Sequence, residues 1–250
     1  MNTEIETPRA TAGVKMLYLI KRKADTTREE LVVHWFANHM PLTIKFMEHQ
    51  ASKGKLHASS YIVTLFDPKK GDDYPWDGVA QMRWDIPPPM PDEPYGTKPT
   101  DSFQQRVEPY MPWATTEYII MEGARHVKAE PLKLNNPFPC TRSGFYKVNF
   151  LVAAKKDTDF DQFFGHWLNV HVPNIRSVML EVGGFRYVVM HSLNPQTAPY
   201  SGMAELYFSD INAWHDFGKA FTPDGMDQWV DNKETLILGA RTELIGIPDV

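Results

Sequence analysis

The residues best suited to chemistry in this sequence are histidines in a motif that occurs twice. His-Trp-x-x-x-His-x-Pro spans residues 34–41 and again residues 166–173. The second histidine of each motif, His39 and His171, ends an apolar stripe, so we expect its ring near the edge of a sheet. A neutral imidazole there can act as a general base, because its pKa lies close to working pH. We therefore interpret His39 and His171 as the catalytic candidates.

These histidines also have a structural interpretation. A histidine at the end of a helix can bond the last carbonyls, and the helix C-terminus favours the protonated ring. A base role therefore requires burial or a partner to offset that preference. The first histidine of each motif, His34 or His166, is interpreted as structural. On a regular helix, residues five apart point about 140° from each other, which is a poor geometry for a pair of metal ligands.

Other chemical motifs are missing from the sequence. It contains no Cys-x-x-Cys pair, no phosphate-cradling glycine loop and no Gly-x-Ser-x-Gly elbow. Nicotinamide, P-loop and serine-hydrolase chemistry therefore have no support. We predict neither a metal site nor a bound cofactor.

The elements that position the histidines belong to an internal repeat. The stretch that begins at Val14 aligns without a gap with the stretch that begins at Tyr146. The identical pairs are Lys15/Lys147, Asp25/Asp157, Thr26/Thr158, His34/His166, Trp35/Trp167, His39/His171 and Pro41/Pro173. Matches of rare residue types at this frequency indicate a duplication.

Each copy is predicted to be a βαββαβ unit, which is the ferredoxin-like motif. The predicted strands are residues 15–20, 60–65, 79–84 and 117–121 in the first copy, and 147–152, 185–191, 203–208 and 234–238 in the second. A second helix is predicted clearly only at residues 211–220. Two such sheets can close face to face, so the fold class is α+β, with tandem ferredoxin-like repeats forming an intrachain pseudo-dimeric α+β barrel.

The first helix of each copy has predicted ends. Capping-box pairs, Thr26 with Glu29 or Thr158 with Asp161, indicate where it begins. A proline, Pro41 or Pro173, is predicted to end it, because the residue before a proline avoids the helical region.

Alternation along the strands predicts which side chains line a binding site. Apolar side chains at every second position should pack under the helices, and the remaining mixed set should face inward. His191 lies on the same strand face as Tyr187 and could reach the same cavity. Lysines and an arginine would offer positive charge, and tyrosines, an asparagine and a glutamate would offer hydrogen bonds. The predicted substrate-binding residues are Lys15, Tyr61, Arg83, Lys147, Asn149, Tyr187, His191, Glu205 and Tyr207.

The repeat also predicts how the chain is divided. Residues 1–13 form a flexible N-terminal segment, 14–127 the first repeat, 128–144 a linker and 145–250 the second repeat. Residues 85–101 hold six prolines and have no counterpart in the second copy. Such proline density predicts a semi-rigid extended loop. The alternatives for this loop are a lid, an oligomer arm or a surface excursion.

The composition of the sequence limits the classes of molecule that the protein is expected to bind. A net charge of −5, from 26 basic and 31 acidic residues, gives no basic footprint for nucleic acid. No apolar run approaches the length of a membrane span, and the N-terminal residues do not resemble a secretory signal. A single cysteine, Cys140, suits a reducing cytoplasm. A small organic molecule is therefore the expected partner, and exposed strand edges with the proline-rich loop would suit a homodimer.

The repeated histidine motif, after a Lys-plus-apolar strand and a Thr-capped helix, resembles the EthD family of the dimeric α+β barrel superfamily. The resemblance covers residues 14–127 and 145–247. It implies that duplication replaces the dimerisation of single-copy relatives. It also implies cofactor-free chemistry on aromatic or polyketide compounds, by dehydratases, cyclases, isomerases or monooxygenases. The family's helix-end histidine corresponds to His39 and His171.

Three functions follow from these observations. The first is a cofactor-independent lyase or isomerase that acts on a phenolic or other aromatic molecule by histidine acid–base catalysis. Elimination, decarboxylation, loss of a small aldehyde and double-bond migration all suit it. The second is a haem enzyme similar to chlorite dismutase, with His171 as axial ligand. The third is a barrel that binds a small ligand without chemistry.

Overall fold

The computed structural model describes residues 8–68, 75–127, 129 and 133–249. Parts of the predicted segments 1–13 and 128–144 lie outside the described residues. The chain forms two compact units. The N-unit comprises Ala12–Ala114, Lys128–Ser143 and Ala240–Val250, and the C-unit comprises Met1–Thr11, Thr115–Val127 and Gly144–Gly239. Each unit therefore combines most of one copy with the last strand of the other.

An antiparallel sheet forms the base of the N-unit. Its strands lie in the order β1 (Val14–Ile20), β3 (Gly78–Trp84), β2 (Ala58–Phe66), β9 (Leu236–Ile247) and β5 (Cys140–Arg142). The first three strands confirm the predicted ranges to within two residues. The last strand was predicted at residues 234–238, but it begins later and continues to Ile247. Alternation misses the extension because Glu243 is fully buried beside Arg142, so a charged side chain stands at an inward position.

The C-unit contains a second antiparallel sheet. Its strands lie in the order β4 (Trp113–Met121), β7 (Gly184–Ser192), β8 (Gly202–Phe208) and β6 (Tyr146–Val152). Here too the predicted strands are confirmed, with β4 beginning four residues earlier than residue 117. The fold is thus mixed α/β, with antiparallel sheets and few helices. The closed barrel of tandem ferredoxin-like repeats remains a prediction.

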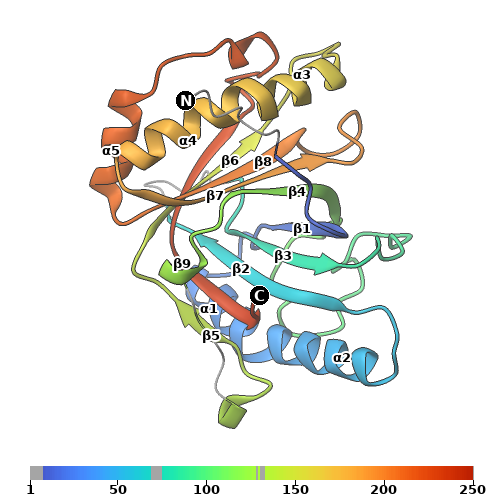
Figure 1. Cartoon of the computed structure of the whole chain (residues 1–250). Coiled ribbons are helices and arrows are strands. Elements are labelled where there is room, and N and C mark those ends of the chain that lie inside the picture. Colours follow the sequence, from blue (N-terminus) through green and yellow to red (C-terminus); the bar gives the residue numbers. More distant parts are fainter. Residues whose placement is uncertain (1–7, 69–74, 128, 130–132, 250) are drawn as a thin grey trace. The chain divides into compact units, whose positions relative to one another are not determined.

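The helices cover one face of each sheet, as Figure 1 shows for α2 beside β2 and β3. In the first copy, α1 (Arg28–His34) continues through a π turn (Trp35–His39) into α2 (Met40–Ser52). The second copy repeats this arrangement with α3 (Phe160–His166), a π turn (Trp167–His171), α4 (Val172–Glu181) and a further helix, α5 (Ile211–Ala220). Single 3-10 turns occur at Ala124–His126, Lys133–Asn135 and Met226–Gln228. In the described part of the chain, no helix has the length and apolar character needed to cross a membrane.

The prediction that Pro41 and Pro173 end their helices is wrong. Both prolines lie in the first turn of the helix that follows, where the missing N–H is not needed. The π turn prepares this position, because the Met40 N–H donates to the carbonyl of Trp35, five residues back. The inserted residue opens the α-helical ladder just before the proline, so the chain continues as a helix.

The helix starts also differ from the prediction by one residue. Thr27, not Thr26, caps α1, and its hydroxyl and the Glu30 side chain form a reciprocal capping box. In the second copy Asp159 is the cap, and it accepts from the N–H groups of Asp161 and Gln162. Thr158 instead donates its hydroxyl to the Lys155 carbonyl. Adjacent threonines and aspartates compete for the capping position, so the pattern alone does not choose between neighbours.

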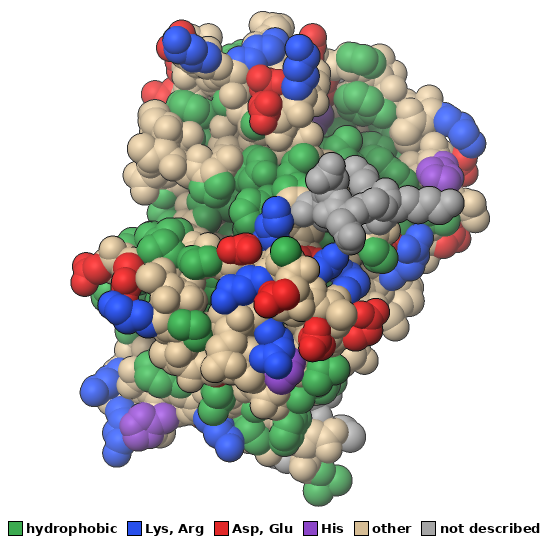
Figure 2. Space-filling model, turned by 180° about the vertical axis from the view of Figure 1, so that it is seen from behind, with side chains coloured by type: hydrophobic (Ala, Val, Ile, Leu, Met, Phe, Trp, Pro, Cys, Tyr) green, Lys and Arg blue, Asp and Glu red, His purple; other side chains and the backbone are tan. Residues whose placement is uncertain are grey.

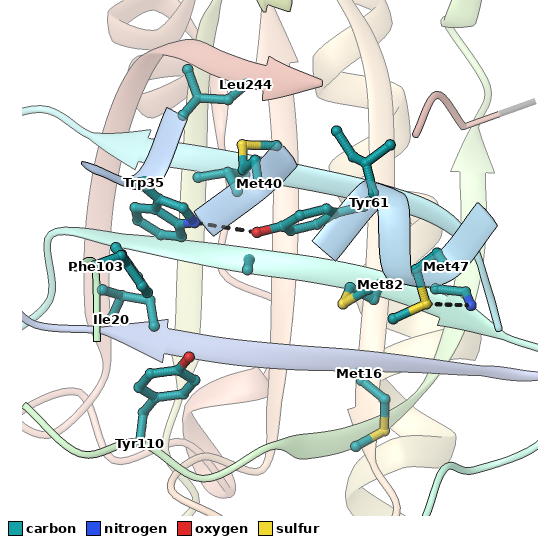
Figure 3. Packing of buried hydrophobic residues seen from close by; sticks show 14 of the residues in the cluster. Met16, Ile20, Trp35, Met40, Met47, Tyr61, Met82, Phe103, Tyr110 and Leu244 are labelled. Carbon is teal, nitrogen blue, oxygen red and sulfur yellow. Dashed lines mark hydrogen bonds between the residues drawn. The ribbon is translucent and has the colours of Figure 1, made fainter. Parts of the chain in front are cut away.

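A tryptophan from each π turn packs directly on its sheet. Trp35 lies in the core of the N-unit with Met82 and Tyr61 (Figure 3). Trp167 takes the same place in the C-unit. Both indoles lie against a glycine: Gly78 under Trp35 and Gly202 under Trp167. The predicted apolar strand positions do pack under the helices, because Ala80, Met82 and Trp84, and Ala204, Leu206 and Phe208, belong to these two cores.

The copies differ after their third strand. The second copy has the amphipathic helix α5, whose aromatic side chains Trp214 and Phe217 pack on Phe208. The first copy has the proline-rich loop at residues 85–101, which is irregular except for a bridge between Tyr95 and Tyr110. This replacement determines where a pocket opens.

We predict that Gly202→Ala destabilises the protein. A Cβ at this position would lie 2.6 Å from the Met190 carbonyl oxygen and 3.0 Å from the Trp167 ring. Overpacking of this kind costs about 1–3 kcal/mol, measured as a lower midpoint of urea unfolding. Gly165→Ala is the control, because a Cβ there meets nothing within 4 Å and helix propensity favours alanine. Equal midpoints for both variants would refute the packing argument.

Candidate functional site

The N-unit contains a pocket of about 350 Å³. It lies against the helix-covered face of the sheet, and its walls come from β1, β2, β3, the π turn, α2 and the proline-rich loop with the segment that follows it. Most of the lining is apolar or aromatic, which suits a small organic ligand. The polar or titratable side chains in the lining are Tyr18, His39, Thr43, Tyr61, Tyr95, Thr100, Asp101, Gln104 and Tyr110.

His39 is paired with a carboxylate in this pocket. Its Nδ1 lies 2.6 Å from Oδ2 of Asp101, and the side chains are 18% and 9% exposed. The ring stacks on Phe103, with 4.5 Å between centroids. The other oxygen of Asp101 accepts from the backbone N–H of Gln104 at 2.8 Å. The ring of His39 is therefore held in one orientation by a hydrogen bond and a stacking contact.

The charge on Asp101 determines the tautomer of His39. Burial alone would raise the pKa of Asp101, but hydrogen bonds from His39 and Gln104 outweigh it and hold that pKa below its usual range. An ionised carboxylate only accepts hydrogen bonds, so Nδ1 of His39 carries the proton. In the neutral ring, Nε2 then has the lone pair. This is the arrangement of a general base oriented by a carboxylate.

Four tyrosines surround the same pocket. The rings of Tyr18, Tyr95 and Tyr110 lie 5.7–6.3 Å from one another, and Tyr61 lies deeper, under Trp35. Burial raises the pKa of Tyr18, Tyr61 and Tyr110 well above the usual range, and neighbouring phenols add to the shift. These hydroxyls therefore stay protonated and can donate hydrogen bonds at any ordinary pH.

The second copy keeps the histidine–carboxylate pair. Nδ1 of His171 lies 2.9 Å from Oδ2 of Asp224, and Asn174 donates to the same oxygen at 2.8 Å. Burial lowers the pKa of His171, and Asp224 only partly offsets this. Phe221 at the end of α5 packs against the imidazole ring, 6.2 Å between centroids. His171 lines neither the N-unit pocket nor the pocket around residues 153–160 and 195–201.

The π turn changes the relation between the two histidines of each motif. In the second copy, His166 and His171 both approach Asp224, with His166 Nε2 3.8 Å from Oδ1. In the first copy, His34 bonds Ser102, the neighbour of Asp101, at 2.8 Å. The expectation that these side chains diverge by about 140° is therefore wrong, because it assumed a regular helix.

The predicted charged lining lies elsewhere. Lys147 and Glu205 form a buried ion pair, 2.6 Å between Nζ and Oε1, on the sheet face opposite the helices of the C-unit. Asn149 donates to the Leu238 carbonyl, and Lys147 lies 4.8 Å over the Tyr207 ring. In the N-unit, the register pairs Lys15 with Arg83 on the corresponding face. None of these six side chains lines the N-unit pocket or the pocket around residues 153–160 and 195–201, and their role in substrate binding stays a prediction.

The remaining predicted residues divide between the two units. Tyr61 lines the N-unit pocket with His39. Tyr187 and His191 lie under the helices of the C-unit, where Tyr187 belongs to the core. His191 stacks on Phe164 at 4.1 Å and lies 4.9 Å from Trp167. From the predicted set, the N-unit pocket thus contains His39 and Tyr61, while Lys147, Asn149, Glu205 and Tyr207 lie together on the other face of the C-unit sheet.

Sequence reasoning missed both carboxylates. Asp101 follows Thr100 at the end of the proline-rich loop, and Asp224 follows Thr222 and a proline after α5. These short Thr-(Pro)-Asp stretches occupy equivalent places in the two copies, and aligning them was the available signal. Gaps between them and the histidine motifs hid the correspondence. The aromatic walls, Tyr18 and Tyr110, were hidden because sequence assigns such side chains to the core.

The described residues show neither a metal-binding cluster nor a basic surface patch on the face drawn in Figure 2. No group of three His, Cys, Asp or Glu side chains among the described residues could hold a metal ion. On the face drawn in Figure 2, basic and acidic side chains are interspersed. This mixture agrees with the absence of a basic footprint in the sequence.

We predict that the buried ring of His191 makes the fold sensitive to acid. Burial lowers the pKa of His191 from 6.5 to about 3, and among the described residues its Nε2 has no hydrogen-bond partner. The folded state keeps the ring neutral while the unfolded chain takes up a proton, so stability falls with pH below 6.5 by about 1.4 kcal/mol per pH unit, until the folded-state pKa is reached.

The check is His191→Met, unfolded in urea at several pH values. The difference in free energy of unfolding between variant and wild type should move in favour of the variant by about 3 kcal/mol between pH 6.5 and about pH 4. Subtracting the two proteins cancels the contribution of the carboxylates. A difference that stays constant with pH would contradict the prediction.

Comparison with known proteins supports the fold. A protein described as anthrone oxidase-like superposes with a TM-score of 0.55 at 11% identity, over 95% of this chain and 94% of that chain. A putative monooxygenase from Fusobacterium nucleatum subsp. nucleatum gives 0.48 at 9% identity, over 95% of both chains. A mutant chlorite dismutase from Candidatus Nitrospira defluvii gives 0.44 at 10%, over 92% of both. At such identities the first comparison shows a shared fold alone, and the other two carry no argument.

The family comparison concerns the second copy. No curated protein matches the sequence significantly. The EthD domain model matches residues 155–237, which include α3, the π turn with His171, and α5. This match confirms the family resemblance for that copy, and the resemblance of residues 14–127 stays a prediction. Residues 155–237 of this chain match the EthD domain model, so the second copy is similar to that family.

Proposed function

We propose that this protein is an enzyme, a cofactor-independent lyase that acts on a phenolic or other aromatic molecule in the N-unit pocket. The observation that carries the proposal is the pairing of His39 with Asp101 inside a largely apolar pocket. A base fixed by a carboxylate, beside protonated phenols, supplies proton transfer without any other group.

His39 acts as the base through Nε2. Asp101 holds Nδ1–H and stabilises the imidazolium that forms when Nε2 takes a proton. Phe103 keeps the ring in plane by stacking, and the aromatic walls exclude water from the face of the substrate. The same imidazolium then returns the proton to the product. Proton removal and return by one residue is enough for an elimination, a decarboxylation or the loss of a small aldehyde.

Loss of an aldehyde illustrates the balance of atoms. His39 removes the proton of a hydroxyl group on the carbon next to the reacting carbon. The carbon–carbon bond breaks, the oxygen forms the carbonyl of the leaving aldehyde, and the bonding electrons pass to a carbonyl or quinone-type oxygen conjugated with the aromatic ring. The imidazolium protonates the resulting carbanion, so no oxidant or reductant is consumed.

The first copy is the better site of the two. Its proline-rich loop leaves the sheet face open and contributes Pro88, Pro89 and Asp101 to the pocket. In the second copy, Trp214 and Phe217 pack on that face, and Phe221 lies against His171. We therefore assign catalysis to His39 and a structural role to His171.

A haem at His171 does not fit the residues present. A proximal ligand needs open volume beside one ring nitrogen. The bond between Nδ1 of His171 and Asp224 would itself suit a ligand that binds through Nε2. Haem is disfavoured because the aromatic side chains of α5 occupy the neighbouring sheet face.

A panel of hydroxylated and carboxylated phenolic compounds tests the proposal, with products followed by mass spectrometry under nitrogen and then in air. Turnover should occur without oxygen. His39→Gln should lower it by about 10²–10⁴-fold, and Asp101→Asn should lower it less, because the ring stays in place but loses its ionic partner. His171→Gln is the matched control and should keep nearly full activity.

Three outcomes would contradict the proposal. Turnover only with oxygen uptake would indicate oxidation, as the neighbour described as anthrone oxidase-like suggests. Equal activity in His39→Gln and wild type would show that His39 is not the general base. Tight binding of phenols with no product from any compound would indicate a binding protein.

A further inference from the structure

We infer that the hydroxyl groups of Tyr61 and Tyr110 bind the substrate oxygen on which negative charge develops, and so restrict the substrate to compounds with a carbonyl or phenolic oxygen. This inference rests on the proposed function. It adds two donors that act opposite the base, and it makes Trp35 and Gln104 positioning residues.

Tyr61 is the better defined of the two donors. It lines the pocket, yet it is only 2% exposed. Its oxygen accepts a hydrogen bond from the indole N–H of Trp35 at 3.3 Å (Figure 3). Among the described residues, the hydroxyl of Tyr61 donates to no acceptor. A buried O–H group that lacks an acceptor is unfavourable unless a ligand supplies one.

Tyr110 repeats this arrangement from another element. It lies in the segment before β4, is 9% exposed and lines the same pocket. The side chain of Gln104 opposes the rise in the pKa of Tyr110, as an N–H group directed at the phenol oxygen does, and Oε1 of Gln104 is occupied by the N–H and hydroxyl groups of Thr100. Gln104 therefore offers its amide N–H, which leaves the O–H of Tyr110 available to donate. In both tyrosines the oxygen is fixed by a neighbour and the hydrogen is left for the pocket.

The two hydroxyls and the base face a common space. Burial, together with the charge of Asp101, raises the pKa of both phenols, and Tyr61 also raises the pKa of Tyr110. Both therefore remain donors. The negative charge of Asp101 would repel an anionic substrate. His39 becomes positive when it accepts the substrate's proton, and this charge offsets the repulsion at the moment when the substrate oxygen becomes negative. Preorganised donors aimed at such an oxygen are commonly the largest contribution to catalysis.

The Trp35–Tyr61 contact also explains a feature of the repeat. The tryptophan of the motif lies four residues before the catalytic histidine, and the π turn directs both toward the sheet. Trp35 thus links the helix that carries the base to the strand that carries the donor. Its indole N–H fixes the direction of the Tyr61 hydroxyl, and it does not itself contact the reacting atoms.

The test uses 4-nitrophenol, whose phenolate form absorbs at a longer wavelength than the phenol. We would titrate the bound probe with pH in wild type, Tyr61→Phe, Tyr110→Phe and His39→Gln. In wild type the bound probe should ionise at a lower pH than the free probe. Each tyrosine variant should bind the phenolate about tenfold more weakly, because a hydrogen bond to a charged group is lost. Tyr187→Phe, the equivalent tyrosine of the second copy, should match wild type.

Nitrobenzene is the second probe, because it fills the pocket but has no ionisable oxygen. Its affinity should be unchanged in Tyr61→Phe and Tyr110→Phe. An equal loss of both probes would mean that the tyrosines only hold the pocket together, and would overturn the inference. If only His39→Gln alters the ionisation of the bound probe, Tyr61 and Tyr110 are not the donors, whereas the assignment of His39 as the base is kept. If wild type binds neither probe, the proposed site fails and the inference fails with it.

Discussion

The π turn that precedes each proline is the constraint on which the rest of the structure depends. A regular helix would end at Pro41, and the tryptophan and second histidine of the motif would have different directions. With one extra residue in the turn, Trp35 packs on Gly78 and Tyr61 while His39 reaches Asp101. The same turn places Trp167 on Gly202 and His171 at Asp224. The motif therefore directs its tryptophan and second histidine toward the sheet. Whether the histidine has room for a ligand depends on the segment that packs against it.

What lies opposite differs between the copies. In the C-unit, α5 provides a regular helix with Trp214, Phe217 and Phe221 in a row of stacked rings. In the N-unit, six prolines prevent a helix, and the chain instead crosses as an irregular loop that brings Asp101 to His39 and leaves a pocket of about 350 Å³. The two copies thus share the same helix and strand arrangement around the motif, and the replacement of a helix by a loop separates a packed core from a pocket.

Most of the strands and helices could be predicted from the sequence. The position of the pocket could not, and the reason is physical. Strands β1, β2, β3 and their counterparts follow from alternation, and α5 follows from its apolar stripe. The side of the sheet that holds the pocket was not foreseen. Alternation assigns polar side chains to a site and apolar ones to a core, but here buried charges such as Lys147 and Glu205 satisfy each other, whereas the pocket lies among aromatic residues on the helix side.

The second histidine–carboxylate pair shows that the contact between a histidine and a carboxylate does not by itself identify a catalytic site. His171 and Asp224 are as close to contact as a base and its partner need to be, and Asn174 supports them. The pair nevertheless lies against Phe221 at the end of α5, and hydrogen bonds of this kind also satisfy buried polar groups that would otherwise be costly. His39 and Asp101 have almost the same contacts and the same exposure. What distinguishes His39 is the pocket beside it, where the tyrosine hydroxyls lack acceptors among the described residues, and on this difference we base the proposal that His39 is the base.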